Sequence, residues 1–209
     1  MNGILALQGG GPFAANDELD RRLLAAAGAS KVVMLPTADA YEHPELLVAA
    51  SMHWGERLGI EVEALMVMRR GEAMDESAVA VLQGARAVYL VGDQPLHLRS
   101  VLKGTPLWEA ICQVLAEGGV VAATGGSAGA MCDPMVDPRG GAFTLGLGLI
   151  DGIALVTEAE TWSADRLHRT LKLANTPVAE LPSGSALVHT ADGWEQVGDV
   201  IMHGELPTV

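Results

Sequence analysis

Apolar residues follow two alternating patterns over the first 130 positions of the chain. Short runs of consecutive apolar residues are each followed by a longer segment in which apolar residues recur every three or four positions. Continuous apolar runs are typical of strands covered on both faces, as in parallel sheets, and the wider spacing is typical of amphipathic helices. The pattern therefore predicts a β-α unit that is repeated five times.

Glycines and prolines place the boundaries of these units. The first three predicted helices end at Gly28, Gly59 and Gly84, and Pro95 suits the first turn of the fourth. This order predicts one doubly wound, mostly parallel α/β sheet with helices on both faces, whose ligand lies beyond the carboxyl ends of the strands. The predicted strands cover 3–7, 31–38, 60–67, 87–91 and 120–123, and the predicted helices cover 17–27, 44–58, 75–82, a segment from Pro95, and 108–117.

The pattern changes after residue 130. An irregular segment at 133–141 precedes a predicted strand at 153–156 and a predicted helix at 163–173. Three short alternating segments at 185–188, 194–197 and 200–203 predict an antiparallel edge hairpin or meander. Because no repeat or long linker divides the chain, we expect a single domain over residues 1–209.

Composition narrows the function classes. Hydrophobic residues make up 49% of the chain and charged residues 19%, which excludes disorder, and no apolar run reaches the ~18 to 20 residues of a membrane span. The start of the chain has no basic leader, so we expect a cytoplasmic protein with no membrane partner. The net charge of −13 disfavours nucleic acid as a partner. Four tryptophans favour a possible homodimer, with one of them at the interface.

The sequence contains no motif for binding a metal or an organic cofactor. Cys112 and Cys132 are far apart, and neither they nor the histidines follow a metal-ligand spacing. We therefore expect two buried thiols, no metal site and no organic cofactor.

A turn rich in small residues joins the fifth predicted strand to a short helix. Residues Gly125-Gly126-Ser127-Ala128-Gly129 have the pattern Gly-x-Ser-x-Gly. A serine in such a turn is expected to adopt a strained backbone conformation between small neighbours, with its hydroxyl at a helix N-terminus that favours developing negative charge. The motif predicts a nucleophile elbow at Ser127. The alternative is a turn whose small residues only allow close packing.

Two further motifs flank the serine turn. Val91-Gly92-Asp93-Gln94 precedes it, and Gly146-Leu147-Gly148-Leu149-Ile150-x-Gly152 follows it. Together with Pro36-Thr37-Ala38, this order resembles the serine peptidases that include cyanophycinase and dipeptidase E. The resemblance covers most of the chain. It implies a class I glutamine amidotransferase-like, flavodoxin-like fold in which serine replaces the usual cysteine of the elbow.

The resemblance also implies roles for individual residues. Ser127 would attack a peptide carbonyl, and the backbone N–H groups of Gly92 and Ala128 would hold the oxyanion. Asp93 and Gln94 on the Gly92 loop, with Glu160, are expected to contact substrate. Gln94 equally fits a second role as the cap of the following helix.

The general base departs from this family pattern. Relatives carry a catalytic histidine after the strand that follows the Gly-Leu-Gly segment, and Glu158 occupies that place here. Glu158 or its neighbour Glu160 could serve as the base if burial raised the carboxyl pKa. His168 on the next helix and His97 after the Gly92 loop are alternative bases, and loss of the chemistry with retention of the pocket is the fourth possibility.

Three functions follow from these motifs. The first is a serine-type peptidase or amide hydrolase that acts on small peptides through an acyl-enzyme at Ser127, with Arg99, Arg139 and Arg166 as the available cations for an acidic ligand. The second is a relative without catalysis that binds a small ligand or partner in the same cleft. The third is an α/β-hydrolase-type esterase in which Asp192 and His203 complete the triad.

Overall fold

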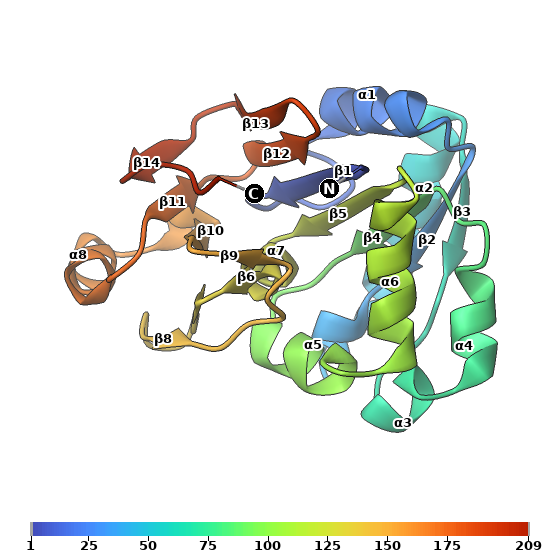
Figure 1. The fold of residues 1–209 in the computed structure, drawn as a ribbon, viewed down its shortest axis with the longest axis horizontal. Coiled ribbons are helices and arrows are strands. Elements are labelled where there is room, and N and C mark those ends of the chain that lie inside the picture. The colour runs from blue at the N-terminus through green and yellow to red at the C-terminus, as the bar shows by residue number, and fades with distance from the viewer. Residues whose placement is uncertain (1, 209) are drawn as a thin grey trace.

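Seven strands form one sheet at the centre of the computed structural model, which describes residues 2–208 (Figure 1). The strand order is β13-β12-β1-β5-β4-β2-β3. The five strands from β1 to β3 in this order run parallel, and β12 and β13 add an antiparallel hairpin at one edge. The strands are β1 (Ile4–Gln8), β2 (Lys31–Leu35), β3 (Glu61–Ala64), β4 (Ala87–Leu90), β5 (Val120–Thr124), β12 (Ala186–Thr190) and β13 (Gly193–Val197).

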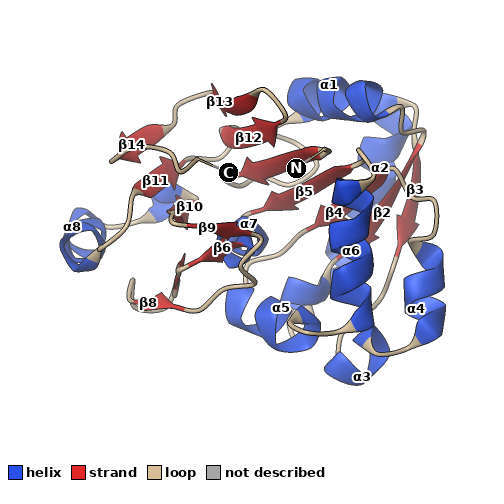
Figure 2. Ribbon diagram, in the orientation of Figure 1, coloured by secondary structure: helices blue, strands red, loops and turns tan. Residues whose placement is uncertain are grey.

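Helices cover both faces of this sheet (Figure 2). Side chains alternate along each strand, so one set packs with α1 (Asp17–Ala27) and α2 (Pro44–Leu58), around the buried Trp54. The other set packs with α3 (Arg70–Ala73), α4 (Glu76–Val81), α5 (Pro95–Leu102) and α6 (Pro106–Ala116). The predicted doubly wound, mostly parallel α/β sheet is confirmed. The four-residue helix α3 was not predicted.

A second, smaller sheet lies beside the central one. It has the order β10-β11-β14 and contains β10 (Ala154–Thr157), β11 (Val178–Leu181) and β14 (Ile201–His203). Helix α8 (Ala164–Leu173) packs on its face through Leu167 and Leu171. The predicted hairpin at 185–197 is confirmed, but the third segment pairs with β11 instead of extending that hairpin.

The two sheets share one hydrophobic core. Leu155 and Leu181 of the small sheet belong to the same buried cluster as Leu7 and Ala123 of the central sheet. Short elements lead from β5 to β10: α7 (Gly126–Met131), β6 (Cys132–Asp133), β7 (Met135–Val136), β8 (Phe143–Thr144) and β9 (Ile150–Asp151). Two short 3-10 helices lie elsewhere, η1 (Thr37–Asp39) after β2 and η2 (Ala159–Thr161) after β10. None of the helices described between residues 2 and 208 is long and apolar enough to span a membrane.

Candidate active site

Two loops meet at the carboxyl edge of the central sheet. Strands β4 and β5 are parallel neighbours, with Leu90 opposite Ala123, so the loop after Leu90 and the turn after Thr124 leave the sheet side by side. This adjacency places two of the sequence motifs at one edge of the sheet. It brings Gly92 and Ser127, which are 35 positions apart, into direct contact.

The strained position of the strand-to-helix turn is Gly125, and the expectation that Ser127 is strained is wrong. Gly125 has φ 64° and ψ −136°, whereas the only described non-glycine residues with positive φ are Phe13 and Glu158. Strand β5 continues to Thr124, so the chain must turn at once, and Ser127 already lies in the first turn of α7. A Cβ atom at position 125 would lie 2.5 Å from Asp93 Oδ1, and the positive φ is a conformation that favours glycine.

Ser127 is fully buried in this arrangement, with none of its surface exposed. Its hydroxyl donates a hydrogen bond to the Gly92 carbonyl oxygen at 3.0 Å, and its N–H donates to the same oxygen at 2.9 Å. No hydrogen bond joins Ser127 to a titratable side chain within residues 2–208. The serine therefore locks the Gly92 loop to α7 in this conformation.

The backbone N–H groups near the serine differ in whether they are hydrogen-bonded. Ala128 N–H donates to Gly125 O at 3.0 Å, and Asp93 N–H donates to Asp39 Oδ1 at 2.7 Å. Gly92 N–H makes no hydrogen bond with another described residue. Of the two N–H groups predicted to hold an oxyanion, that of Gly92 is thus free among the described residues, and that of Ala128 is hydrogen-bonded within its own turn. The catalytic role of both groups stays a prediction.

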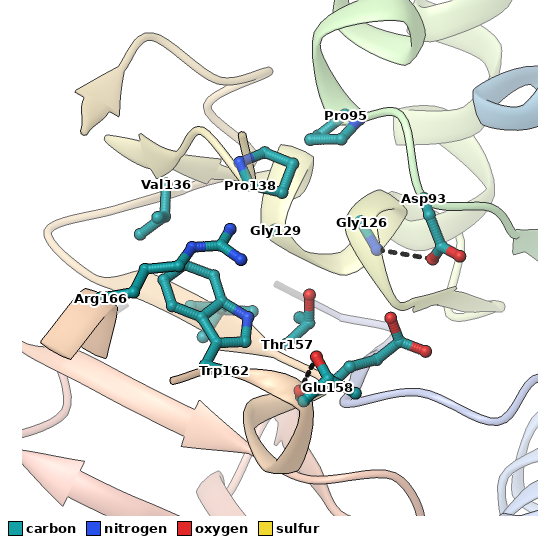
Figure 3. A pocket seen from close by; sticks show the side chains of 12 residues that line it. Asp93, Pro95, Gly126, Gly129, Val136, Pro138, Thr157, Glu158, Trp162 and Arg166 are labelled. Atoms are coloured by element: carbon teal, nitrogen blue, oxygen red, sulfur yellow. Dashed lines mark hydrogen bonds between the residues drawn. The ribbon is translucent and has the colours of Figure 1, made fainter. Parts of the chain in front are cut away.

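A small cavity of about 170 Å³ opens beside the serine turn (Figure 3). Its volume is below the roughly 300 Å³ at which pockets for drug-sized ligands begin, so it suits a group of one or two residues. Strand β10 of the small sheet, helix α7 and the loop that carries Asp93 after β4 contribute to its wall. The lining residues are Asp93, Pro95, Gly126, Gly129, Val136, Pro138, Leu155, Thr157, Glu158, Thr161, Trp162 and Arg166.

Glu158 stands at the end of β10 in a left-handed conformation, with φ 49°. Its N–H donates to Gly9 O at 2.9 Å, which joins the small sheet to the loop after β1. Its carboxylate points toward that of Asp93 across the cavity (Figure 3). Burial raises the pKa of Glu158, and the negative charges of Asp93, Glu160 and Asp39 raise it further.

Asp93 is the second carboxylate of the cavity. Its Oδ1 accepts a long hydrogen bond of 3.4 Å from Gly126 N–H. Desolvation raises the pKa of Asp93, and the charge of Asp39 adds to the effect. Two carboxyl groups with raised pKa values therefore face the same small space, which is typical of functional sites.

Arg166 supplies a positive charge on the opposite side of the cavity. Its guanidinium lies over the Trp162 ring, 3.6 Å from the ring centroid. Nε and Nη2 are buried and have no hydrogen-bond partner among residues 2–208. Desolvation lowers the pKa of Arg166, partly offset by the charge of Asp137. Buried N–H donors normally have a hydrogen-bond partner, so these two nitrogens are available to an acceptor on a ligand.

Ser127, Gly92 and Ala128 are not among the residues that line the cavity, and neither are the remaining predicted site residues. Gln94 is exposed at the start of α5 and makes no side-chain cap bond. Glu160 binds Ser183, accepting from its hydroxyl at 2.6 Å. His97 Nε2 lies 3.0 Å from Met68 O, and His168 is exposed on α8.

The structure also distinguishes among residues that the sequence left equivalent. Arg99 binds Gly146 O and Arg139 binds Asp137, so of the three cations in the sequence analysis only Arg166 faces the cavity. His203 is paired with Glu180 in the small sheet and does not bind Ser127. The triad of an α/β-hydrolase-type esterase is therefore not assembled.

Sequence reasoning did not single out Trp162 or Asp39. Trp162 had been considered only as one of four tryptophans, although it lies four positions before Arg166. Asp39 directly follows Pro36-Thr37-Ala38 at the carboxyl end of β2, a strand adjacent to β4. That position was the available signal, because carboxyl ends of neighbouring parallel strands share one edge.

The fold and this edge define the class of the protein: a mostly parallel α/β protein with a serine-containing strand-to-helix turn above its ligand edge. The chain belongs to peptidase family S51, whose family model matches residues 4–136. The matched region contains Gly92, Asp93 and Ser127 and ends before Glu158.

Curated relatives and solved structures agree with this assignment. The cyanophycinases of Trichormus variabilis and of a Nostoc species are each 29% identical over 194 residues, which cover 86% of this chain and 65% of the relative. The chain thus spans about two thirds of the length of these relatives. A peptidase from an acI-B1 actinobacterium superposes with a TM-score of 0.85 at 25% identity, covering 95% of this chain and 88% of that one.

A second solved structure supports the fold alone. A protein named as a candidate peptidase E from Listeria monocytogenes gives a TM-score of 0.69 at 16% identity. The superposition covers 97% of this chain and 98% of the other.

Proposed function

We propose that this protein hydrolyses a peptide or amide bond in a small acidic substrate, in the cavity between the serine turn and α8. The observation that carries the proposal is the Arg166 guanidinium, whose buried Nε and Nη2 have no hydrogen-bond partner among the described residues, in the same cavity as Glu158. Membership of peptidase family S51 supports the reaction class, and the small volume of the cavity supports a substrate of dipeptide size. No metal or organic cofactor is invoked.

Arg166 is assigned the acidic group of the substrate because its neighbourhood leaves its charge uncompensated. The carboxylate that acts on it electrostatically, Asp137, is held by Arg139 through bonds of 3.0 Å from Nε and 2.7 Å from Nη2. A buried charge without a partner is unfavourable, and a bound carboxylate would satisfy both free donors. Stacking on Trp162 fixes the guanidinium plane before the ligand arrives.

Ser127 and Glu158 are assigned the chemical steps. Ser127 Oγ would leave the Gly92 carbonyl by rotation of its side chain and form a bond with the substrate carbonyl carbon, while its proton passes to Glu158. The C–N bond then breaks, and Glu158 returns the proton to the leaving nitrogen. Water then attacks the acyl carbon with Glu158 as the base, the ester bond between that carbon and Ser127 Oγ breaks to release the acid, and Glu158 returns the proton to Oγ. The raised pKa makes Glu158 a better base than an ordinary glutamate.

A second candidate function is binding without catalysis in the same cavity. The observation in its favour is that Ser127 is fully buried and its hydroxyl is engaged by Gly92 O, with no base bonded to it among the described residues. An unassisted serine hydroxyl is a poor nucleophile.

A serine-directed fluorophosphonate separates the two functions. The hydrolase is expected to be labelled at Ser127, as located by peptide mass spectrometry, and to cleave members of an acidic dipeptide library. Ser127→Ala should abolish both signals. Ser51→Ala is the matched control, because Ser51 is also fully buried and donates to a carbonyl oxygen, that of Val48, far from the site. If the intact protein shows neither labelling nor cleavage but binds acidic dipeptides, the binding function is correct and the hydrolase is not.

A further inference from the structure

We propose that Asp39 is a positioning residue that holds the Gly92–Asp93 loop in place over the serine turn. The part of its test that measures kcat rests on the proposed hydrolase function, whereas the part that measures amide hydrogen exchange at Asp93 does not. Asp39 lies in η1, directly beyond the carboxyl end of β2, and neither the serine motif nor the family's histidine position points to it.

A single hydrogen bond connects Asp39 to the loop across 54 positions of sequence. Asp93 N–H donates to Asp39 Oδ1 at 2.7 Å, a short, charge-assisted bond. The backbone of η1 and of the adjoining turn is separately bonded, since Asp39 N–H donates to Pro36 O and Glu42 N–H to Asp39 O. The carboxylate therefore sits on a fixed support and reaches over to the loop.

The Asp39 carboxyl group also fills the space beside Gly92. A Cβ atom at position 92 would lie 2.5 Å from Asp39 Oδ1, 2.8 Å from Asp39 Cγ and 2.9 Å from Ala38 Cβ. Gly92 adopts φ 113°, a conformation that side chains rarely allow. The absence of a side chain at Gly92 thus lets the Asp39 carboxyl group pack directly against the loop backbone.

Ser127 holds the other side of the same loop. The Gly92 carbonyl oxygen accepts both the N–H and the hydroxyl of Ser127, while the next N–H along the chain, that of Asp93, is taken by Asp39. With the Asp93 amide engaged in this way, Gly92 N–H and Gln94 N–H are the loop donors left without a partner among the described residues. Asp39 therefore determines which amide of the loop is available to a developing oxyanion and where it points.

The test compares Asp39→Ala with Asp39→Asn. The asparagine keeps a carbonyl oxygen that can accept from Asp93 N–H, and the alanine does not. Amide hydrogen exchange at Asp93 should accelerate about fivefold or more in the alanine variant, because the bond contributes of order 1 kcal/mol, and should stay near the parent rate in the asparagine variant. In the kinetic assay, Asp39→Ala should lower kcat about 10- to 100-fold with little change in KM, whereas Asp39→Asn should retain kcat within about threefold.

Asp75→Ala is the matched control. Asp75 Oδ1 likewise accepts a backbone bond, from Ser77 N–H at 2.8 Å, but at the start of α4. This variant should leave both the Asp93 exchange rate and kcat unchanged. Unchanged Asp93 exchange in Asp39→Ala would overturn the proposal, and so would an Asp39→Asn variant as impaired as the alanine. A parent protein that hydrolyses nothing would refute the proposed function alone, since the exchange experiment still decides the role of Asp39.

Discussion

At the scale of single residues, the site differs from its family pattern at the base. Glu158 stands where the resemblance places a histidine, and it does so in a left-handed backbone conformation beside a second carboxylate. A carboxyl group can replace an imidazole as a base near neutral pH only if its surroundings disfavour its charge. Burial and three neighbouring acids provide such surroundings for Glu158.

Replacing Glu158 by glutamine tests its role as the base. Glu158→Gln keeps the size of the side chain and removes the proton acceptor, so kcat should fall about 100-fold or more, as is typical for loss of a general base. Fluorophosphonate labelling and steady-state hydrolysis measure the effect. Glu160→Gln is the control, because Glu160 binds Ser183 outside the cavity wall, and its kcat should change little. Equal losses in both variants would show that Glu158 is not the base.

The pH profile tests the electrostatics of the same residue. A base with a raised pKa works only when it is deprotonated, so kcat/KM should fall with decreasing pH at values above the ordinary range of a glutamate. After burial, the largest cause of the raised pKa is the charge of Asp93. Asp93→Asn should therefore move this acid limb to lower pH. An acid limb that stays in place would show that the charge of Asp93 does not raise the pKa of the catalytic base.

Part of the site was predictable at this scale, and part was not. Ser127 and Gly92 follow from short motifs because a motif is a property of neighbouring residues, and Glu158 follows from the place at which the resembling family carries its histidine. The importance of Arg166 depends on Asp137 being occupied by Arg139 and on the absence of any partner for two of its own nitrogens. The lack of partners is a tertiary fact, and the sequence offered Arg166 only as one of three cations.

At the scale of elements, the turn between β5 and α7 depends on close backbone approach. Gly125 carries the unusual backbone conformation, and Gly126 lies against the backbone of Asp93, where a Cβ atom would come within 2.6 Å of the Asp93 carbonyl. The close packing of the serine turn thus depends on Gly125 and Gly126 as much as on Ser127.

Two glycines of one helix give a matched test of this packing. Gly126→Ala should lower the free energy of unfolding by about 1 to 3 kcal/mol, because the loop carrying Asp93 must move. Gly129→Ala, three positions later in α7, meets no atom within 4 Å and should be neutral or stabilising by roughly 0.5 to 1 kcal/mol. Urea denaturation measures both. A harmless Gly126→Ala would mean that the loop tolerates displacement.

The order of elements was predictable where local pattern determines it. The five β-α units were recognised because apolar strands and amphipathic helices repeat in a form that neighbouring residues specify. Strand β11 was missed: it is flanked by Pro177 and Pro182 and carries Glu180 at a buried position. Its pairing with β10 and β14 depends on contacts distant in sequence, as does the separation of the small sheet from the central one.

At the scale of the whole molecule, one buried acid links several elements beneath the site. Asp20 of α1 accepts hydrogen bonds from Gln8 of β1 at 2.7 Å, Tyr89 of β4 at 2.9 Å and Trp54 of α2 at 3.1 Å. Gln8 in turn accepts from Thr124, which precedes the serine turn. Desolvation outweighs these bonds and raises the pKa of Asp20 to about 6.

This pKa predicts a pH dependence of stability. A carboxyl group whose pKa is higher in the folded than in the unfolded state stabilises the fold when protonated. Its contribution is present below the unfolded value of 3.8 and is lost as the pH rises through about 6. Relative to Asp20→Asn, which cannot titrate, the parent protein should gain up to about 3 kcal/mol of unfolding free energy between pH 8 and pH 4.

Denaturation at several pH values measures this difference. The exposed Asp192 offers the control, since the parent and Asp192→Asn should keep a nearly constant difference over the same range. A difference between the parent and Asp20→Asn that does not change with pH would show that Asp20 stays ionised in the folded protein.

The central claim is that the cavity hydrolyses small acidic substrates through the charge of Arg166. The most direct measurement is the ratio of kcat/KM for an aspartyl dipeptide to that for the matching asparaginyl dipeptide, in the parent, Arg166→Gln and Arg169→Gln. Arg169 is an exposed arginine three positions later in α8 and serves as the control. We predict a ratio of about 10 or more in the parent and in Arg169→Gln, and a ratio near unity in Arg166→Gln. A ratio that survives the loss of Arg166, or a parent that does not distinguish the two substrates, would contradict the account.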